Sequence, residues 1–450
     1  MKLRNKDFYK NMASIAVPIV IQNLITSSLN MVDTVMIGSL GKSNIAAVGL
    51  ANQFFFLFVL LLFGINSGAA IFISQFWGKR DIVNIRKVQG IAMLSGLILS
   101  IGFGGAAFFL PEQILRIFST DSVVIDLGSR YIKIVSISYF LTAISFSYSF
   151  ASRSIGHAKL PMMVSAISLG INTLFNYVLI FGNLGFPELK IIGAAIATLT
   201  ARAVELTLLL FIIYRSGNVL AAKVKELFDF SYDFIRKFFN TTLPVILNEG
   251  FWSLGVTMYS IAYARISTDA IASVQIATTV QNVFMVIGRG LASACAVMIG
   301  NKIGANEEPE AVNYSKRFAI ISTVLGIILG CLLFLSSHMI LGLFNISQQV
   351  YINAQKILWI MALIMGAKMF NLILIVGILR SGGDTKFSLF LEAGSVWIVG
   401  VPMAFIGAHL LKLPIHWVVL MVSSEEIVKA LIGIPRVISK KWVKNVVKDL

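Results

Sequence analysis

The chain consists of long apolar runs separated by short polar segments that are rich in Lys and Arg. A run of about 20 apolar residues is long enough to cross the hydrocarbon core of a bilayer as an α-helix. A transmembrane β-barrel would show shorter segments of alternating polarity instead. The pattern therefore predicts an all-α, polytopic membrane protein. We expect twelve spans, near residues 12–38, 45–76, 88–110, 131–152, 161–182, 192–214, 240–265, 270–299, 315–337, 355–380, 387–409 and 414–435.

Composition and charge support this prediction. The chain is 57% hydrophobic and 13% charged, whereas a soluble domain is about 25% charged. The net charge of +16 could indicate a nucleic-acid partner. However, most of the cations fall in segments such as 79–87, 215–237 and 436–448, which the order of spans places on one side. By the positive-inside rule we expect a multi-pass protein of the cell membrane, with both termini in the cytoplasm and no nucleic-acid partner.

The chain also repeats itself at a constant offset of 226 residues, from Pro18 to Pro244. A constant offset over most of a half indicates an internal duplication. Each half has six predicted spans, an even number, so both copies enter the membrane from the same side. Parallel repeats of this kind are related by a pseudo-two-fold axis along the membrane normal, which is an architecture of transporters. Further matched pairs are Gly64 with Gly290, Gly78 with Gly304, and RSIGHAK at 153–159 with RSGGDTK at 380–386 after one inserted residue.

The repeat divides the chain into three parts. We assign residues 1–214 to an N-terminal lobe, 215–239 to a cytoplasmic linker and 240–450 to a C-terminal lobe. The linker is the longest polar stretch of the central region, and we expect it to be amphipathic.

Asp33 is the first candidate functional residue, because an ionisable side chain inside a membrane helix is energetically costly. Asn172 and Asn176 share one face of a second span at i, i+4, and Thr198 lies in a third. If the spans alternate in direction, all four residues lie at a similar depth. Their oxygens suit Na⁺, with Asp33, Asn172 and Asn176 as ligands. They also suit a proton, since burial favours the neutral form of a carboxyl. The alternative is that these residues only pack helices together.

The same residues resemble the multidrug and toxic compound extrusion (MATE) transporters. The matching motifs are MVDTVMIG after Pro18, AAVGLA at the start of the second span, Gln75-x2-Gly78-x-Arg80, the Asn172-x3-Asn176-Tyr177 pattern, and RSGGDTK. The resemblance implies twelve helices in two lobes and cation-coupled export of organic compounds. It also implies a coupling-ion site formed by the acidic residue of helix one and polar residues of helices five and six. In this chain those residues are Asp33, Asn172, Asn176 and Thr198.

The second lobe departs from the family pattern. Glu249 lies five residues after Pro244, whereas many family members carry a glutamate eight residues after that proline, on roughly the same helix face. The helix-ten aspartate of those members is replaced here by Met369, with Lys368 and Asn371 beside it. We therefore expect Glu249, Lys368 and Glu425 to form a charge network near Asn371. A static ion pair is the alternative.

These observations predict a cation-coupled (H⁺ or Na⁺) antiporter that exports amphipathic, often cationic organic compounds by alternating access. A flippase of lipid-linked precursors is the alternative, but it would need a strongly basic cavity, and few cations, among them Arg202, Arg289 and Lys368, lie within spans away from their ends. An enzyme is not expected, because no metal-spaced His/Asp cluster or nucleophile elbow is present. The expected partners are an organic small molecule, the coupling cation and the lipid bilayer. We expect a monomer without a cofactor.

Overall fold

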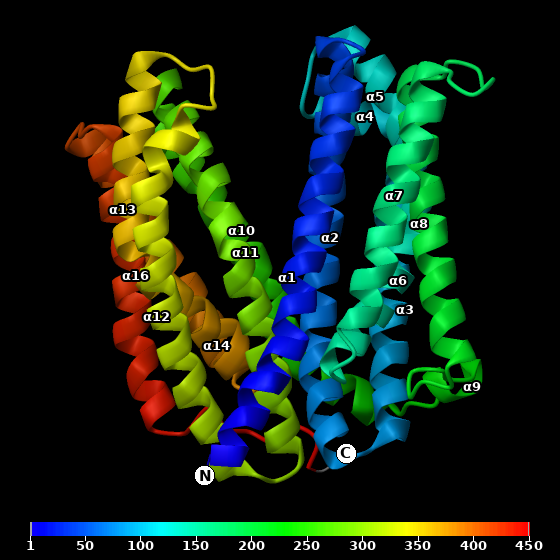
Figure 1. Ribbon diagram of the computed structural model, residues 1–450, viewed down its shortest axis with the longest axis vertical. Coiled ribbons are helices and arrows are strands. Elements are labelled where there is room, and N and C mark those ends of the chain that lie inside the picture. Colours follow the sequence, from blue (N-terminus) through cyan, green and yellow to red (C-terminus); the bar gives the residue numbers. More distant parts are fainter. Residues whose placement is uncertain (1, 449) are drawn as a thin grey trace. The chain divides into compact units, whose positions relative to one another are not determined.

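The computed structural model describes residues 2–448 and 450, except for the side chains of residues 2–6 and 30, and the described residues contain helices and no β-strand (Figure 1). The helices of the first half are α1 (Lys2–Gly38), α2 (Lys42–Lys79), α3 (Ile82–Phe109), α4 (Pro111–Arg116), α5 (Ser122–Val135), α6 (Ile137–Ser154), α7 (Lys159–Phe181) and α8 (Lys190–Arg215). Then follow α9 (Val224–Leu227), α10 (Tyr232–Ala264), α11 (Thr268–Gly304), α12 (Glu308–Leu341), α13 (Gln348–Leu372), η1 (Ile373–Arg380), α14 (Thr385–Gly394), η2 (Ser395–Gly400), α15 (Val401–Phe405), η3 (Ile406–Leu410) and α16 (Ile415–Ile438).

Every predicted span corresponds to a helix or to a continuous series of helical segments. Among the described residues, nine helices are long and apolar enough to cross a membrane, or ten if α5 and α6, which are bent by 47°, form one span. The remaining two predicted spans are α10 and α16, which fall below this apolarity. They carry Glu249, Glu425, Glu426 and Lys429. The all-helical, multi-pass architecture predicted from the sequence is therefore confirmed.

The central segment is more helical than the sequence indicated. Helix α10 begins at Tyr232, inside the segment 215–239, because the Ser231 hydroxyl accepts a hydrogen bond from the Phe234 N–H at 3.3 Å and caps the helix. The short helix α9 lies against α3 through an ion pair of 2.9 Å between Arg86 and Glu226. Leu227 is buried and anchors this segment, whereas Phe228 is exposed.

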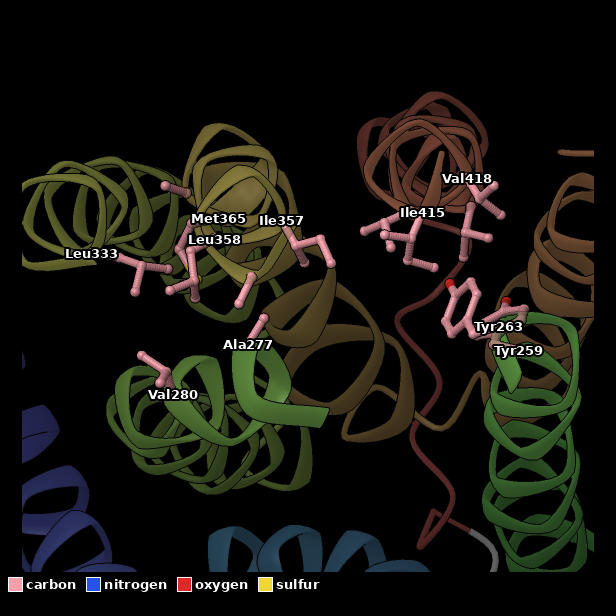
Figure 2. Close-up of a cluster of buried hydrophobic side chains, with 14 of the residues drawn as sticks. Tyr259, Tyr263, Ala277, Val280, Leu333, Ile357, Leu358, Met365, Ile415 and Val418 are labelled. Atoms are coloured by element: carbon pink, nitrogen blue, oxygen red, sulfur yellow. The ribbon is translucent and has the colours of Figure 1, made fainter. Parts of the chain in front are cut away.

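The chain forms two compact units. One unit comprises residues 17–73 and 81–238, and the other comprises the chain up to residue 16 together with residues 74–80 and 239–450. The first unit is built around a cluster in which the rings of Phe58 and Tyr139 stack at 4.9 Å. The core of the second unit packs Leu333, Met365 and their neighbours between helices, and Tyr259 and Tyr263 of α10 lie on the side that faces Ile415 and Val418 of α16 (Figure 2).

The backbone repeats the offset seen in the sequence. Arg80 and Asn306 are 226 residues apart, and both end a long helix in the left-handed region, at φ 61° and 59°. Gly156 and Gly383, which match after the inserted residue, have φ 85° and 81°. Positive φ is uncommon for residues other than glycine, so its recurrence at matched positions confirms the duplication in the fold.

The ends of α2 and α11 cross at two matched glycines. A methyl group at Gly78 would lie 2.0 Å from the Asn301 carbonyl oxygen, and one at Gly304 would lie 1.8 Å from the Gln75 carbonyl oxygen. Only glycine permits two helix backbones to approach this closely. The crossing explains why Gln75-x2-Gly78 and Asn301-x2-Gly304 have the same spacing.

Residues 439–448, the C-terminal segment, lie on this crossing. The buried Gln75 side chain donates to the carbonyl oxygens of Ser381 and Lys444, at 3.0 and 3.2 Å, and accepts from the Val446 N–H at 2.9 Å. Trp442 is fully buried, and a methyl group at Gly382 would lie 2.4 Å from its ring. A single glutamine thus satisfies three backbone groups of two other segments.

We expect Gln75→Ala to lower the free energy of unfolding by about 2–4 kcal/mol, because it leaves three backbone groups without partners in a buried place. Thermal denaturation in detergent measures this loss. Lys79→Ala is the matched control, since Lys79 is exposed and makes one bond of 3.0 Å to the Val447 carbonyl. Equal stability of the two variants would show that the C-terminal segment does not depend on Gln75.

Candidate cation site and buried charge clusters

The first-half site is built around the carboxylate of Asp33 on α1. The buried Asn176 side chain, on α7, donates one hydrogen bond to Asp33 Oδ1 at 2.5 Å and another to Asn172 Oδ1 at 3.0 Å. Asn172 and Asn176 are each 1% exposed, whereas Asp33 is partly exposed. The structure therefore brings together the three residues whose i, i+4 spacing and depth predicted a cluster.

Two further helices complete the surroundings of Asp33. Tyr131 of α5 is buried and lies near Thr198 of α8. Both Tyr131 and Arg202 of α8 lie close enough to Asp33 to interact with it electrostatically. Thr198 therefore lies near the cluster, but no hydrogen bond among the described residues joins it to Asp33, Asn172 or Asn176. Sequence reasoning missed Tyr131, because a tyrosine in a span is usually a packing residue.

The hydrogen bonds of this cluster leave atoms without partners. Asn176 Oδ1 and Asn172 Nδ2 are both buried and have no hydrogen-bond partner among the described residues. A buried polar atom without a partner costs about 1–3 kcal/mol, so such atoms need an explanation. An amide oxygen beside a carboxylate is a pair of hard ligands that fits a small cation. The arrangement can equally stabilise a carboxyl that gains and loses a proton.

We expect Asn176→Ala to raise the coupling-ion concentration for half-maximal transport about tenfold, without abolishing transport. It removes one oxygen and one donor to Asp33, which together contribute about 1.5 kcal/mol. Transport at varied ion concentration measures the shift. Asn183→Ala is the control, because Asn183 follows α7 and its exposed side-chain amide donates to the Tyr177 carbonyl, away from Asp33. An unchanged ion dependence would show that Asn176 only packs the helices together.

A second polar network in the same unit connects α1, α6, α7 and α8. Arg153 donates to Gln22 Oε1 at 2.7 Å, and Gln22 donates to Ser165 Oγ at 2.9 Å. Ser165 in turn donates to Glu205 at 3.3 Å, and Glu205 forms an ion pair of 2.8 Å with Arg202. Arg202 and Glu205 lie at i, i+3 on α8, so this ion pair is local to one helix.

The second unit contains the matching network with more charge. Arg380 is 2% exposed and forms ion pairs with Glu249 at 2.7 Å and with Glu392 at 3.4 Å. Asn248 donates to the same Glu392 oxygen at 2.5 Å. The repeat relates the arginine, amide and acceptor positions of the two networks: Arg153 with Arg380, Gln22 with Asn248, and Ser165 with Glu392.

Helix α16 supplies a third cluster. The Lys429 ammonium lies 3.3 Å from Glu425 and 3.6 Å from Glu426, and all three side chains are nearly buried. The Tyr259 hydroxyl donates to Glu425 Oε2. Gly400 makes room for this contact, since a methyl group there would lie 2.5 Å from that carboxylate oxygen. The Lys429 ammonium therefore forms ion pairs with two carboxylates.

The remaining second-lobe candidates lie on α13. Asn371 donates to the backbone oxygen and to the carboxylate of Glu426, each at 2.7 Å. Lys368 donates to Gln281 at 2.8 Å and is close enough to Glu425 and Glu426 for electrostatic attraction.

The expected network of Glu249, Lys368 and Glu425 thus has no direct bond between its members. Each has its own partner, namely Arg380, Gln281 and Lys429 respectively. Sequence reasoning missed Glu392, Glu426 and Lys429 as members of the buried clusters. The signal of Glu426 and Lys429 was available, since with Glu425 they form i, i+3 and i, i+4 pairs of charged residues in one span, whereas Glu392 has no charged residue at these spacings.

Comparison with known proteins agrees with this fold. The MatE family model matches residues 18–178 and again 244–406, so its two matches begin 226 residues apart. The "Uncharacterized transporter YisQ" of Bacillus subtilis is 24% identical over 400 residues, which cover 88% of this chain and 87% of that protein. The "Probable multidrug resistance protein NorM" of Thermotoga maritima is 22% identical over 446 residues, covering 97% and 94%.

Solved structures share the same architecture. One is described as "Outward-facing conformation of a multidrug resistance MATE family transporter of the MOP superfamily"; it has a TM-score of 0.86 at 18% identity and covers 96% of both chains. Another, "Crystal structure of MATE in the straight conformation", has a TM-score of 0.86 at 19% identity with the same coverage. At this identity the similarity establishes the fold.

Proposed function

This chain belongs to the MatE family, and from that premise we propose that it is a cation-coupled antiporter that exports amphipathic, often cationic organic compounds. Relatives described as multidrug resistance proteins, which align with nearly the whole chain, support drug-like compounds as the substrate class. The duplicated six-helix halves support alternating access, in which the halves move relative to each other around a central site.

The observation that carries the proposal is the cluster of Asp33, Asn172 and Asn176. It places a carboxylate and an unpartnered amide oxygen next to each other in the interior of an apolar bundle. An ion that binds there neutralises Asp33 and removes the electrostatic penalty of its burial. If the ion binds one conformation of the transporter more tightly, it shifts the population toward that conformation. Coupling then requires only that substrate favours the other conformation.

The experiment uses purified protein in liposomes and a fluorescent cationic dye. A pH gradient and a Na⁺ gradient are imposed separately, each without a membrane potential. We expect one of the two gradients alone to drive dye against its concentration gradient. If neither gradient does so in protein that binds the dye, the proposed coupling is wrong.

The flippase alternative would need a basic cavity, and Arg202, Lys368 and Arg289 already have partners. Arg202 is neutralised by Glu205, Lys368 donates to Gln281, and Arg289 donates to Asn282. No observation favours a pyrophosphate ligand, so the exporter is the function that the site supports best. We propose the cell membrane as its location, with both termini in the cytoplasm, and the monomer as its working form.

A further inference from the structure

The buried charge clusters of the two units differ in the ratio of carboxylates to cations. In the first unit, the carboxylates of Asp33 and Glu205 are matched by the guanidinium groups of Arg153 and Arg202. Apart from the buried Asp384, which pairs with Arg436 and Lys444, the second unit carries four nearly buried carboxylates, and two cations contact them among the described residues. These groups are Glu249, Glu392, Glu425 and Glu426, with Arg380 and Lys429.

Two further cations lie near this second-unit cluster without contacting its carboxylates. Lys368 attracts Glu426 and Glu425 from α13, while its ammonium donates to Gln281. Arg289 of α11 lies near Lys368, but its side chain is exposed and donates to Asn282 at 3.3 Å. Even with Lys368 included, these four carboxylates outnumber the buried cations beside them by one. An isolated buried charge is far costlier than its neutral form, so one of the four carboxyls must be neutralised.

The hydrogen bonds of the cluster indicate independently what neutralises it. Asn248 Oδ1 and Asn371 Oδ1 are buried acceptors without partners, and each belongs to an amide that already donates to a cluster carboxylate. One buried donor, Arg380 Nε, also has no partner among the described residues. The cluster thus has a surplus of one acceptor as well as of one negative charge. A proton corrects both, because it turns an acceptor-only carboxylate into a donor.

The uncompensated negative charge lies on the adjacent carboxylates of Glu425 and Glu426. They share one ammonium, Lys429, whereas Glu249 and Glu392 share a guanidinium that can serve two carboxylates through separate N–H groups. Two carboxylates in one site do not both ionise readily. The groups that face the pair are Tyr259 and Tyr263 of α10, Asn371 and Lys368 of α13, Lys429 of α16 and, across Lys429, Glu392 of α14.

We propose that the Glu425–Glu426 pair is a second proton-binding site, which holds one proton between its carboxyl groups independently of Asp33. The two carboxyls titrate as one unit, so the proton is assigned to the pair and not to either residue. The internal duplication relates this pair to the Asp33 site of the first half. The residue that matches Asp33 at the 226-residue offset is Tyr259, and its hydroxyl donates to Glu425. The second half therefore has a tyrosine where the first half has Asp33. The carboxyl that this tyrosine contacts is Glu425, on α16, the last helix of the repeat.

The test is infrared spectroscopy of the full-length protein in lipid nanodiscs at neutral pH, which detects the C=O stretch of a protonated carboxyl. All variants carry Asp33→Asn, so the result does not depend on ion binding at the first-half site. We expect the Asp33→Asn protein to keep a protonated-carboxyl band. Adding Glu425→Gln, or Glu426→Gln, should remove this band, because the remaining carboxylates then equal the cations. Lys429→Met should increase the band about twofold, since a second carboxyl must then be neutralised.

Two controls keep the test specific. Glu205→Gln removes a paired carboxylate from the first unit and should leave the band unchanged. Arg289→Gln should also leave it unchanged. The proposal is overturned if the Asp33→Asn protein shows no such band, or if the band survives both glutamine substitutions at α16. It is overturned as well if a band appears only after Arg289→Gln, because the exposed arginine would then supply the fourth cation. Should Lys429→Met fail to fold, the isosteric glutamine variants decide the question.

Discussion

Replacing Asp33 with asparagine is expected to abolish ion-driven export and to leave the protein folded. The amide can neither release a proton nor neutralise Na⁺, so ion binding no longer distinguishes the two conformations. The fold should persist, because the new amide oxygen still accepts the hydrogen bond that Asn176 donates to Asp33. Dye accumulation in liposomes under the driving ion gradient should fall to the level of protein-free liposomes, while thermal denaturation and dye binding remain near those of the unmodified protein.

The matched control for this change is Asp126→Asn. Asp126 lies on α5 in an exposed ion pair of 2.9 Å with Arg130, and such pairs contribute about 0–1 kcal/mol. Export should be unaffected. Gradient-driven export by a folded Asp33→Asn protein would show that Asp33 only packs the helices and that coupling resides elsewhere.

Replacing Arg380 with methionine is expected to destabilise the second unit severely. Arg380 is the guanidinium partner of both Glu249 and Glu392, and its side chain is 3% exposed. Its removal leaves two carboxylates without a cation in a buried place, and breaking a buried pair in this way costs about 3–5 kcal/mol. The expected result is a large fall in denaturation temperature or in the yield of folded protein.

The charge explanation can be separated from a packing explanation by a rescue variant. Glu249→Gln combined with Glu392→Gln in the Arg380→Met background removes the unpaired charges and should restore about half of the lost stability. Arg130→Met is the control for loss of an arginine from an exposed pair, and its effect should stay within about 1 kcal/mol. Stability unchanged by Arg380→Met, or no rescue at all, would contradict the electrostatic role.

The first-half cluster could be predicted because its signals are local. Asp33 is conspicuous within its apolar run, and the spacing of Asn172 and Asn176 fixes them on one helix face whatever the tertiary structure. The duplication could be predicted for a similar reason, since a constant offset is visible without knowing any contact. Tyr131 gave no such signal, and only the packing of α5 near α1 and α8 reveals its place beside Asp33.

The second-half clusters could not be assembled from the sequence. The pairing of Glu249 with Arg380 joins positions 131 residues apart, and it depends on how α10 packs against η1. Glu425 was recognised as a buried acid, and Lys429 is its i, i+4 neighbour on α16, but its partner Tyr259 lies on α10, 166 residues away. The start of α10 at Tyr232 was also missed, because a single capping bond from Ser231 outweighs the polar composition of the segment before residue 240.

The most direct test of the central claim is to drive the exchange with a dye gradient in place of an ion gradient and to measure the fluxes of dye and ion together. Liposomes containing the purified protein receive an outward gradient of a cationic dye and no ion gradient, while the movement of H⁺ and Na⁺ is followed together with the dye. Because coupling is reciprocal, the dye gradient alone must drive the coupling ion inward, and Asp33→Asn must stop this ion movement. Dye efflux at an undiminished rate with no accompanying movement of either ion would contradict the account.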